Sequence, residues 1–502
     1  MRNTCYNFLG KVLPLGVGLI SIPILIQGLG IERYGVLILT WMVIGYFGIF
    51  DLGIGRATTK FVAEYLSRNK SAELPSLIWT SLSLLFGLGL VGAVTAYLAT
   101  PMLVEKFFNI SGPLIGETRL AFYLLAFSIP FVVCTAGMSG VLEAQQRFGL
   151  INAIRTPASL ATYLAPLPVL AFTNSLYPIV ALTVGIRLLV WLTFGYFCLS
   201  SLPGRIRPSR PHLDDIKRLL GFGGWLTVSN IISPVMVYMD RFLIGALLTM
   251  QAVAYYVTPY EIVAKLWIIP QSLVPVLFSA FSAYAIEQKD KLVSLQHRGV
   301  KYTFLVLTPI TVGVIIFARP FLGLWLGPEF AQVSTPILQL LAVGVLINSI
   351  AHIPYSAIQA LGRPDLTAKL HLLELPVYLA VLWFAIHTLG LIGVALAWVL
   401  RVSLDAGVLF CWVRRLQPEK TGSPRRLKIG LWLPAGLLLG ATYFLALTPH
   451  NTLKIVFFPV IIAIFTVLAW LYILDNLEKT QFFIIKAKLV RFLLYRGGDL
   501  YG

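Results

Sequence analysis

Charged side chains lie within long apolar segments of this chain, where their types and spacing carry the most information. Glu261 and Lys265 lie four residues apart, as do Arg401 and Asp405, so each pair can meet on one face of a helix. A charge inside hydrocarbon is costly unless it faces a partner or a water-filled cavity. The simplest interpretation of these two pairs is local neutralisation, which lowers the cost of membrane insertion.

Two other charged groups favour a cavity-facing role. Asp51 and Arg56 are separated by a segment that contains Gly53 and Gly55, and glycines let a second helix or a ligand approach the backbone closely. Asp240 and Arg241 are adjacent, and neighbouring side chains on a helix point about 100° apart. The two cannot easily face one neighbouring helix, so neutralisation explains them less well.

Cations in such a cavity favour an anionic cargo, because the guanidinium fork matches the oxygens of a phosphate in a bidentate manner. The sequence shows no Gly-rich nucleotide loop, no metal-ligand spacing among its six histidines, and no nucleophile–base pairing. We therefore predict no catalytic residue, no metal and no cofactor. The predicted substrate-binding residues are Asp51, Arg56, Lys60, Asp240, Arg241 and Lys265.

The elements that position these charges are membrane-spanning helices. The chain has 502 residues, of which 58% are hydrophobic and 12% charged, too apolar a composition for a soluble domain. The apolar segments are continuous rather than alternating, which indicates helices and not a barrel. We predict an all-α polytopic membrane protein with fourteen transmembrane helices, at about 8–30, 35–66, 76–100, 118–142, 153–173, 178–200, 219–247, 255–286, 300–318, 335–358, 370–387, 390–413, 429–447 and 454–474.

The net charge of +18 follows the positive-inside rule rather than a nucleic-acid surface. Most Lys and Arg fall in loops on the side of the N-terminus, which places both termini in the cytoplasm. The basic clusters contact anionic membrane lipids, and no nucleic acid is expected. The four cysteines are dispersed in or beside the spans and imply no disulfide framework.

The chain resembles a duplication. Gly10, Leu15 and Val17 recur at one spacing as Gly221, Leu226 and Val228, and each copy begins on the same side of the membrane. This pattern predicts two parallel six-helix repeats, an N-lobe and a C-lobe around a central cavity, which work by alternating access. The predicted domains are 1–204 for the first bundle, 205–218 for a basic Pro/Arg linker, 219–416 for the second bundle, 417–474 for two additional helices and 475–502 for a basic amphipathic tail.

An opening signature and a seventh-span signature, taken in order, resemble a known family. Leu29-Gly-Ile-Glu-Arg-Tyr-Gly35 and Phe50-Asp-Leu-Gly-Ile-Gly-Arg-Ala57, followed by Asp240-Arg-Phe-Leu-Ile-Gly245 and Tyr255-Tyr256, resemble signatures of the polysaccharide-unit (Wzx-type) flippases. These belong to the multidrug/oligosaccharidyl-lipid/polysaccharide exporter superfamily. The resemblance implies an inner-membrane flippase that moves undecaprenyl-pyrophosphate-linked oligosaccharides of O-antigen or exopolysaccharide from the cytoplasmic to the periplasmic leaflet. It also implies polysaccharide polymerase and chain-length proteins as partners.

Two alternatives stay open at this point. A drug or cation antiporter of the same superfamily needs a membrane-embedded acid for H⁺ or Na⁺, and Asp51, Asp240, Glu261 and Glu374 are candidates. The same ions would be the coupling ions of a driven flippase. A membrane polysaccharide polymerase or ligase is a different class, disfavoured because the predicted outer loops are short. The sequence favours a transporter over an enzyme.

Overall fold

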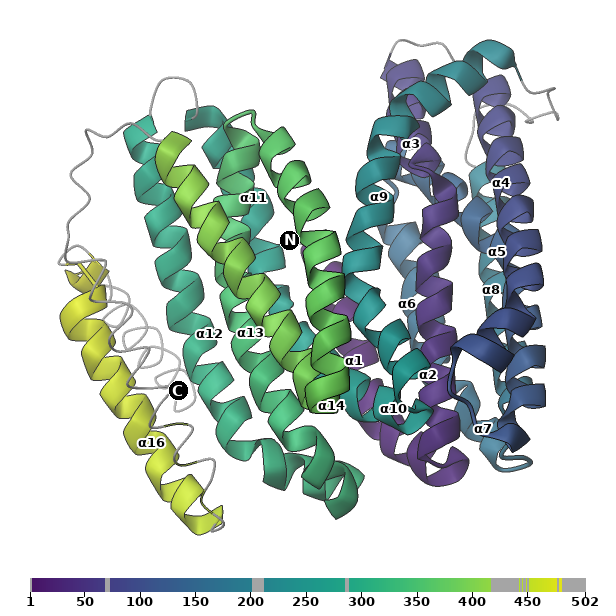
Figure 1. The fold of residues 1–502 in the computed structure, drawn as a ribbon. Coiled ribbons are helices and arrows are strands. Elements are labelled where there is room, and N and C mark those ends of the chain that lie inside the picture. Colours follow the sequence, from purple (N-terminus) through teal and green to yellow (C-terminus); the bar gives the residue numbers. More distant parts are fainter. Residues whose placement is uncertain are drawn as a thin grey trace, which may run out of the picture. The chain divides into compact units, whose positions relative to one another are not determined.

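The computed structural model describes residues 2–67, 73–200, 212–284, 289–416, 451–475 and 478–480, with the single positions 442, 445 and 448. Over these residues the chain forms helices, and no strand occurs among them (Figure 1). The predicted all-α fold class is confirmed. The predicted span 429–447, the first half of the linker and the tail beyond 480 lie largely or wholly outside the described residues.

The helices divide between two compact units, Met1–Thr258 with His371–Ala397, and Pro259–Leu370 with Trp398–Gly502. The domain boundaries predicted from the sequence differ from these units and stay a prediction. Helices α10 and α14 each contribute to both units. The first unit otherwise holds α1 (Arg2–Leu29), α2 (Ile31–Tyr46), η1 (Phe47–Asp51), α3 (Ile54–Ser67), α4 (Leu74–Met102), η2 (Leu103–Phe107), α5 (Gly112–Ala144), α6 (Phe148–Leu164), α7 (Pro166–Leu170), α8 (Leu176–Ser200) and α9 (Leu213–Leu247).

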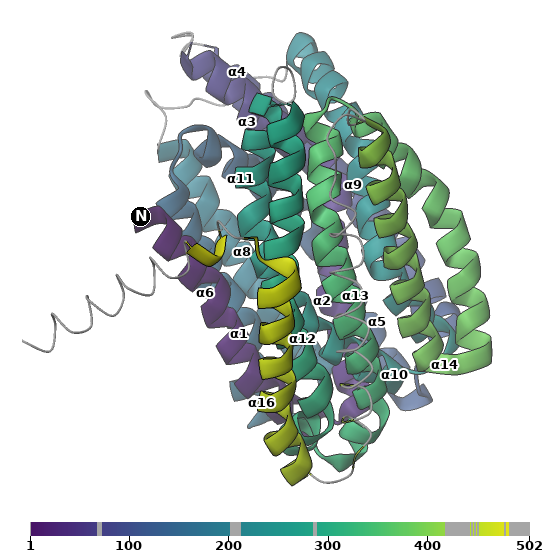
Figure 2. The same cartoon turned by 90° about the vertical axis from the view of Figure 1, so that its left-hand side faces the viewer.

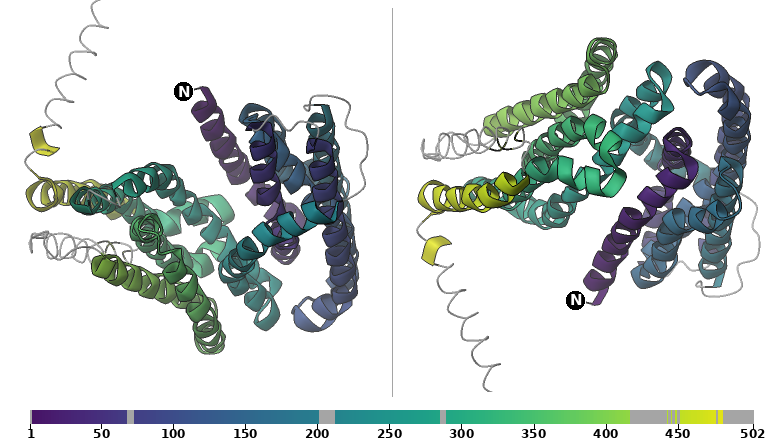
Figure 3. Two further views of the ribbon diagram at one scale, coloured as in Figure 1. Left: turned by 90° about the horizontal axis from the view of Figure 1, so that it is seen from above. Right: turned by 90° about the horizontal axis from the view of Figure 1, so that it is seen from below.

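The second unit holds most of the remaining helices. Seen from above and from below, many helices of each unit are close to end-on, as expected for bundles of side-by-side helices (Figure 3). The elements are α10 (Met250–Ala264), η3 (Lys265–Trp267), α11 (Ile268–Tyr284), α12 (Lys289–Leu326), α13 (Pro328–Ala360), α14 (Pro364–Leu416), α16 (Asn451–Leu468) and η4 (Ala469–Ile473).

Eight of the described helical segments are long and apolar enough to cross a membrane, so the chain is an integral membrane protein. One of them, α14, is broken at Gly390, whose φ is 57°. This residue separates the predicted spans 370–387 and 390–413. The full count of fourteen spans and the parallel repeat stay predictions.

The second predicted span, 35–66, is not one continuous helix. α2 ends at Tyr46, a 3₁₀ turn follows as η1, and α3 begins at Ile54. Leu52 and Gly53 between them have φ values of 46° and 74°. This left-handed region is easy for glycine and unfavourable for leucine, and it redirects the chain between η1 and α3. The apolar pattern continues across the break, which is why the sequence alone predicted a single helix.

Close packing in the first unit holds this break in place. α5 packs against α3, α4 and α8, and Gly140 on α5 lies against the Gly55 carbonyl and the Thr59 hydroxyl of α3. A methyl group at position 140 would lie 2.7 Å from both oxygens, too close for van der Waals contact. Glycine at this position is therefore required for the approach of α5 to the start of α3.

Helix α9 is attached to the rest of the first unit at both of its ends. Near its start, Ser76 donates a hydrogen bond to Asp215 over 3.2 Å, and Arg218 donates to the Tyr65 hydroxyl over 3.0 Å. At the other end, the Asn109 side chain donates to the Leu248 carbonyl over 2.7 Å. Between these points α9 packs against η1 and α3.

In the second unit, α12 pairs with α13 and also with α16, which runs beside it (Figure 2). Phe304, Val312 and Ile316 on α12 share an apolar cluster with Ile461 and Phe465 on α16. The segment after α16 is held to the same helix, because the Lys301 ammonium donates to Glu478 Oε2 over 2.6 Å. Helix α16 is thus fixed to α12 by apolar packing along its length and by an ion pair beyond its end.

Candidate functional site

The break between η1 and α3 positions the first group of predicted site residues. Asp51 ends η1, and its Oδ1 accepts a hydrogen bond from the Gly55 backbone N–H over 2.7 Å. The first N–H groups of a helix have no partner inside the helix, and a carboxylate there is stabilised by the helix dipole. Asp51 therefore caps α3, a role that the sequence spacing did not predict.

Arg56 and Lys60 follow on α3, one helical turn apart, and both are exposed. The opposite face is buried, with the Thr58 hydroxyl against Ser81 of α4. Arg56 lies close enough to Asp51 for the two charges to attract each other. One face of α3 is thus buried in the unit, and the other face presents two cations. Both cations lie within the span 35–66 that the sequence predicts to be in the membrane.

Asp240 and Arg241 lie on α9 and are buried, with 1% and 2% of their surfaces exposed. Asp240 Oδ2 accepts a hydrogen bond from the Tyr256 hydroxyl over 2.8 Å, and Oδ1 accepts one from the Arg241 backbone N–H over 2.8 Å. The Arg241 guanidinium lies 5.0 Å from the centre of the Tyr238 ring, a cation–π contact. In this conformation the two charges form part of a packed core and are not exposed to a cargo.

Lys265 belongs to the second unit and pairs with Glu261, with 3.2 Å between Nζ and Oε2. Both side chains are 42% exposed. The local pairing expected from their four-residue spacing is confirmed. Because solvent screens an exposed pair, its contribution to stability is small.

The structure therefore sorts the six predicted residues into three places. The exposed cations Arg56 and Lys60 share α3 with its cap Asp51, and the buried pair on α9 lies in an adjacent helix of the same unit. Lys265 forms a local ion pair in the second unit. Geometry thus favours α3 as the part of the set that can meet an anion in this conformation.

A further basic residue of the first unit escaped the sequence analysis. Arg155 on α6 donates to the Ser139 hydroxyl over 2.6 Å and lies 3.7 Å from Glu143 Oε1. Ser139 and Glu143 are one turn apart on α5 and hydrogen-bond to each other. Only the α5–α6 packing brings Arg155 to them, because nothing in the local spacing of this residue marks it.

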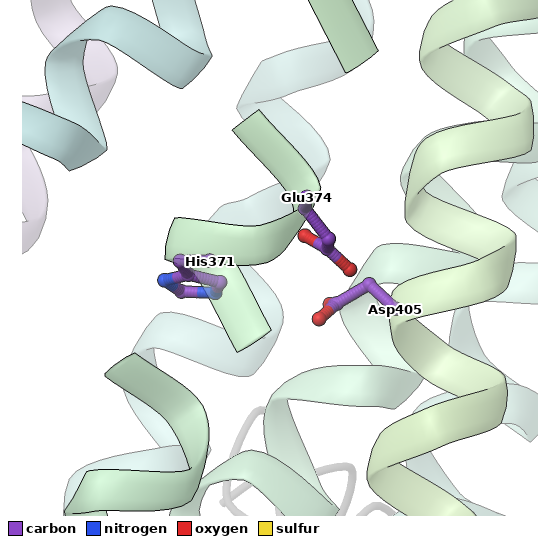
Figure 4. A group of neighbouring side chains, drawn as sticks. All are labelled: His371, Glu374 and Asp405. Carbon is purple, nitrogen blue, oxygen red and sulfur yellow. The ribbon is translucent and has the colours of Figure 1, made fainter. Parts of the chain in front are cut away.

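Figure 4 shows three titratable residues of α14. His371 and Glu374 lie one turn apart on the segment before Gly390, and Asp405 lies on the segment after it. His371 and Glu374 belong to the first unit and Asp405 to the second. An imidazole and a carboxylate on one helix face can share a proton. A closed structural zinc site needs four ligands, and this group of residues offers three.

Comparison with known proteins shows which family the chain matches. Residues 29–335 match the family described as "Polysaccharide biosynthesis protein". A Shigella flexneri protein named as an O-antigen transporter is 33% identical over 82% of this chain and 97% of its own length. The chain belongs to this family. The resemblance expected from the signature motifs, to polysaccharide-unit flippases of the exporter superfamily, is thereby confirmed.

More distant relatives agree with this membership. The lipopolysaccharide biosynthesis protein WzxC of Escherichia coli K12 is 24% identical over 86% of this chain and 84% of its own. Among solved structures, the lipid II flippase MurJ in an inward closed conformation matches 94% of this chain and 97% of its own, with a TM-score of 0.72 and 14% identity. At that identity the MurJ likeness shows a common fold.

Proposed function

We propose that this family member is a flippase for lipid-linked oligosaccharides of surface polysaccharide, O-antigen or exopolysaccharide. It moves units linked to undecaprenyl pyrophosphate from the cytoplasmic to the periplasmic leaflet of the inner membrane by alternating access. Family membership and the names of the relatives support this activity. Membrane lipids surround it, and polysaccharide polymerase and chain-length proteins receive the flipped units.

The exposed cationic face of α3 is the observation that carries the proposal. Arg56 and Lys60 lie one turn apart beside a helix break, and half-helices that begin within the membrane are typical of substrate sites in transporters. A pyrophosphate carries several anionic oxygens, which two neighbouring cations can contact together. The lipid tail would stay in the bilayer while these cations hold the charged head.

Replacing the two α3 cations tests the role of this face. Arg56→Ala and Lys60→Ala should lower surface polysaccharide and leave lipid-linked units in the cytoplasmic leaflet, while membrane abundance stays normal. Arg56→Lys should restore only part of the output, because an ammonium keeps the charge but loses the planar fork.

Arg119→Ala is the matched control, since Arg119 is exposed and pairs with Glu105 away from α3. It should leave both output and abundance unchanged. Normal polysaccharide output from a well-expressed Arg56→Ala, Lys60→Ala double variant would rule out α3 as the cargo-binding site. Normal output from a strain that lacks the chain altogether would remove the flippase function.

A further inference from the structure

The α12–α16 pair in the second unit has a buried lysine at each end, and the two lysines have neighbouring charges of opposite sign. Beyond the end of α16, Lys301 lies within 4.0 Å of two carboxylates, those of Glu478 and Asp475. At the start of α16, Lys454 is also buried, with 2% of its surface exposed. The charge that acts on Lys454 is another cation, Arg319 of α12.

The antiparallel course of the two helices explains this meeting. Phe317 on α12 stacks edge to face on Phe458 of α16 with 5.3 Å between ring centres, and Phe304 contacts Phe465 further along. Moving from these contacts toward the start of α16 brings Lys454 to the level of Arg319. Lys454 is buried at this level, and Arg319 is exposed and close enough to repel it.

Among the residues that the structure describes, acidic side chains do not supply a counter-charge to this pair of cations. Over the described residues, no carboxylate forms an ion pair with Lys454 or Arg319. The undescribed sequence between 417 and 450 contains one acid, Glu419, which the positive-inside rule assigns to the cytoplasmic side. A buried lysine is normally paired, because an isolated ion loses its hydration.

The helix itself adds to this positive potential. Lys454 lies in the first turn of α16, where unpartnered N–H groups and the helix dipole disfavour a cation and favour an anion. Three sources of positive potential therefore meet at one point: the Lys454 ammonium, the Arg319 guanidinium and the start of α16. An anion bound there would neutralise all three.

The surroundings indicate an anion that belongs to a lipid. Phe321 and Trp325, two and six residues beyond Arg319, stack on each other, and tryptophan is enriched at the head-group level of a bilayer. Apolar side chains of α16 that follow Lys454 are exposed, as membrane-facing residues are: Ile455, Val456 and Phe457.

We propose that Lys454 and Arg319 bind the phosphate of a lipid head group where α16 begins. Two lipids carry this chemistry: a resident anionic phospholipid, and a polyprenyl carrier with its diphosphate. In either case the phosphate lies against the two cations and the start of α16, while the hydrocarbon lies along the exposed apolar side chains. This site belongs to the second unit, whereas α3 belongs to the first. Binding of a resident phospholipid does not depend on the proposed transport activity, and binding of the polyprenyl carrier rests on it.

Binding to the purified full-length chain tests the site with defined probes. The lipid probes are dioctanoyl phosphatidylglycerol and farnesyl diphosphate, with zwitterionic dioctanoyl phosphatidylcholine and inorganic pyrophosphate as comparisons. The variants are Lys454→Met, which keeps the side-chain volume without the charge, and Arg319→Gln. Arg298→Gln is the matched control, because Arg298 is exposed near the opposite end of α12.

Each lost cation should weaken binding of an anionic lipid about fivefold, while the control binds as the wild type does. Loss confined to phosphatidylglycerol identifies a resident phospholipid, loss confined to farnesyl diphosphate identifies the carrier, and loss of both identifies the shared phosphate. Equal binding by wild type and variants overturns the site, as does tight binding of phosphatidylcholine or of pyrophosphate alone. Should Lys454→Met fail to fold, the exposed Arg319→Gln decides the question by itself.

Discussion

The Tyr256 hydroxyl donates a 2.8 Å hydrogen bond to Asp240 Oδ2, and this bond joins α10 to α9 inside the first unit. Both residues are buried, and Asp240 also accepts the backbone N–H of Arg241. A buried carboxylate depends on such donors, since it has lost its hydration. The motif that contains Asp240 and Arg241 is therefore part of how α9 and α10 pack.

Removing the Tyr256 hydroxyl should destabilise this packing. Tyr256→Phe leaves Asp240 Oδ2 without its donor, and we expect a loss of about 1–3 kcal/mol in unfolding free energy. Asp240→Asn should weaken the effect of Tyr256→Phe, because the two residues act on one bond. Thermal unfolding of the two single variants and the double variant measures this coupling. Strictly additive losses would contradict a direct bond between the two side chains.

Arg241 and Arg56 should respond differently to truncation. Arg241→Ala removes a buried cation beside Asp240, so protein abundance in the membrane should fall, and loss of polysaccharide should follow abundance. Arg56 is exposed, so Arg56→Ala should lower output at normal abundance. An Asp240→Ala, Arg241→Ala double variant should regain part of the abundance. Normal abundance of Arg241→Ala with abolished output would instead place Arg241 in contact with the cargo.

The cap on α3 gives a third expectation. Asp51→Ala removes the acceptor for the Gly55 N–H and should cost about 1 kcal/mol, whereas Asp51→Ser should cost less because serine is also a good cap. Thermal unfolding of the two variants measures the difference. Asp51→Asn keeps a cap without the charge, so it separates capping from attraction to Arg56. Equal stability of Asp51→Ala and wild type would show that the cap is dispensable.

The sequence predicted the helical class, the family and the Glu261–Lys265 pair, because these depend on local apolar runs, motif order and four-residue spacing. It did not predict the break at Leu52, since a left-handed leucine is set by the packing around it. The sequence also did not predict that Arg241 is buried. A charge in an apolar segment has the same local pattern whether it faces a cavity or a neighbouring tyrosine, and only the tertiary packing distinguishes them.

The charge asymmetry of the loops predicts which ends of the helices face the cytoplasm. Reporter fusions after Phe108 and after Phe330 should show periplasmic exposure, and fusions after Arg210 and after Arg426 should not. Alkaline phosphatase, active only outside the cytoplasm, provides the measurement, and a cytoplasmic reporter at the same points is its control. A cytoplasmic signal after Phe108 or Phe330 would refute the predicted orientation.

The last expectation concerns pH and the attachment of the segment after α16. Burial by itself would raise the pKa of Glu478, but hydrogen bonds from Lys301, Tyr302 and the Asp475 backbone outweigh it and hold that pKa below its usual value of 4.5. A carboxylate with a lowered pKa stabilises the folded state above its unfolded pKa, and the contribution disappears as pH falls through the folded value. The contact with α12 should therefore persist at pH 5 and loosen only below about 4.5.

Spin labels at the exposed positions Ser294 and Thr480, in a chain freed of its native cysteines, report the distance between α12 and this segment. The distance should stay constant from pH 8 to pH 5 and broaden at lower pH. Glu478→Gln, which keeps the shape without the titrating group, should remove the pH dependence. Broadening that already begins between pH 7 and pH 5 would show that a group other than Glu478 controls the attachment.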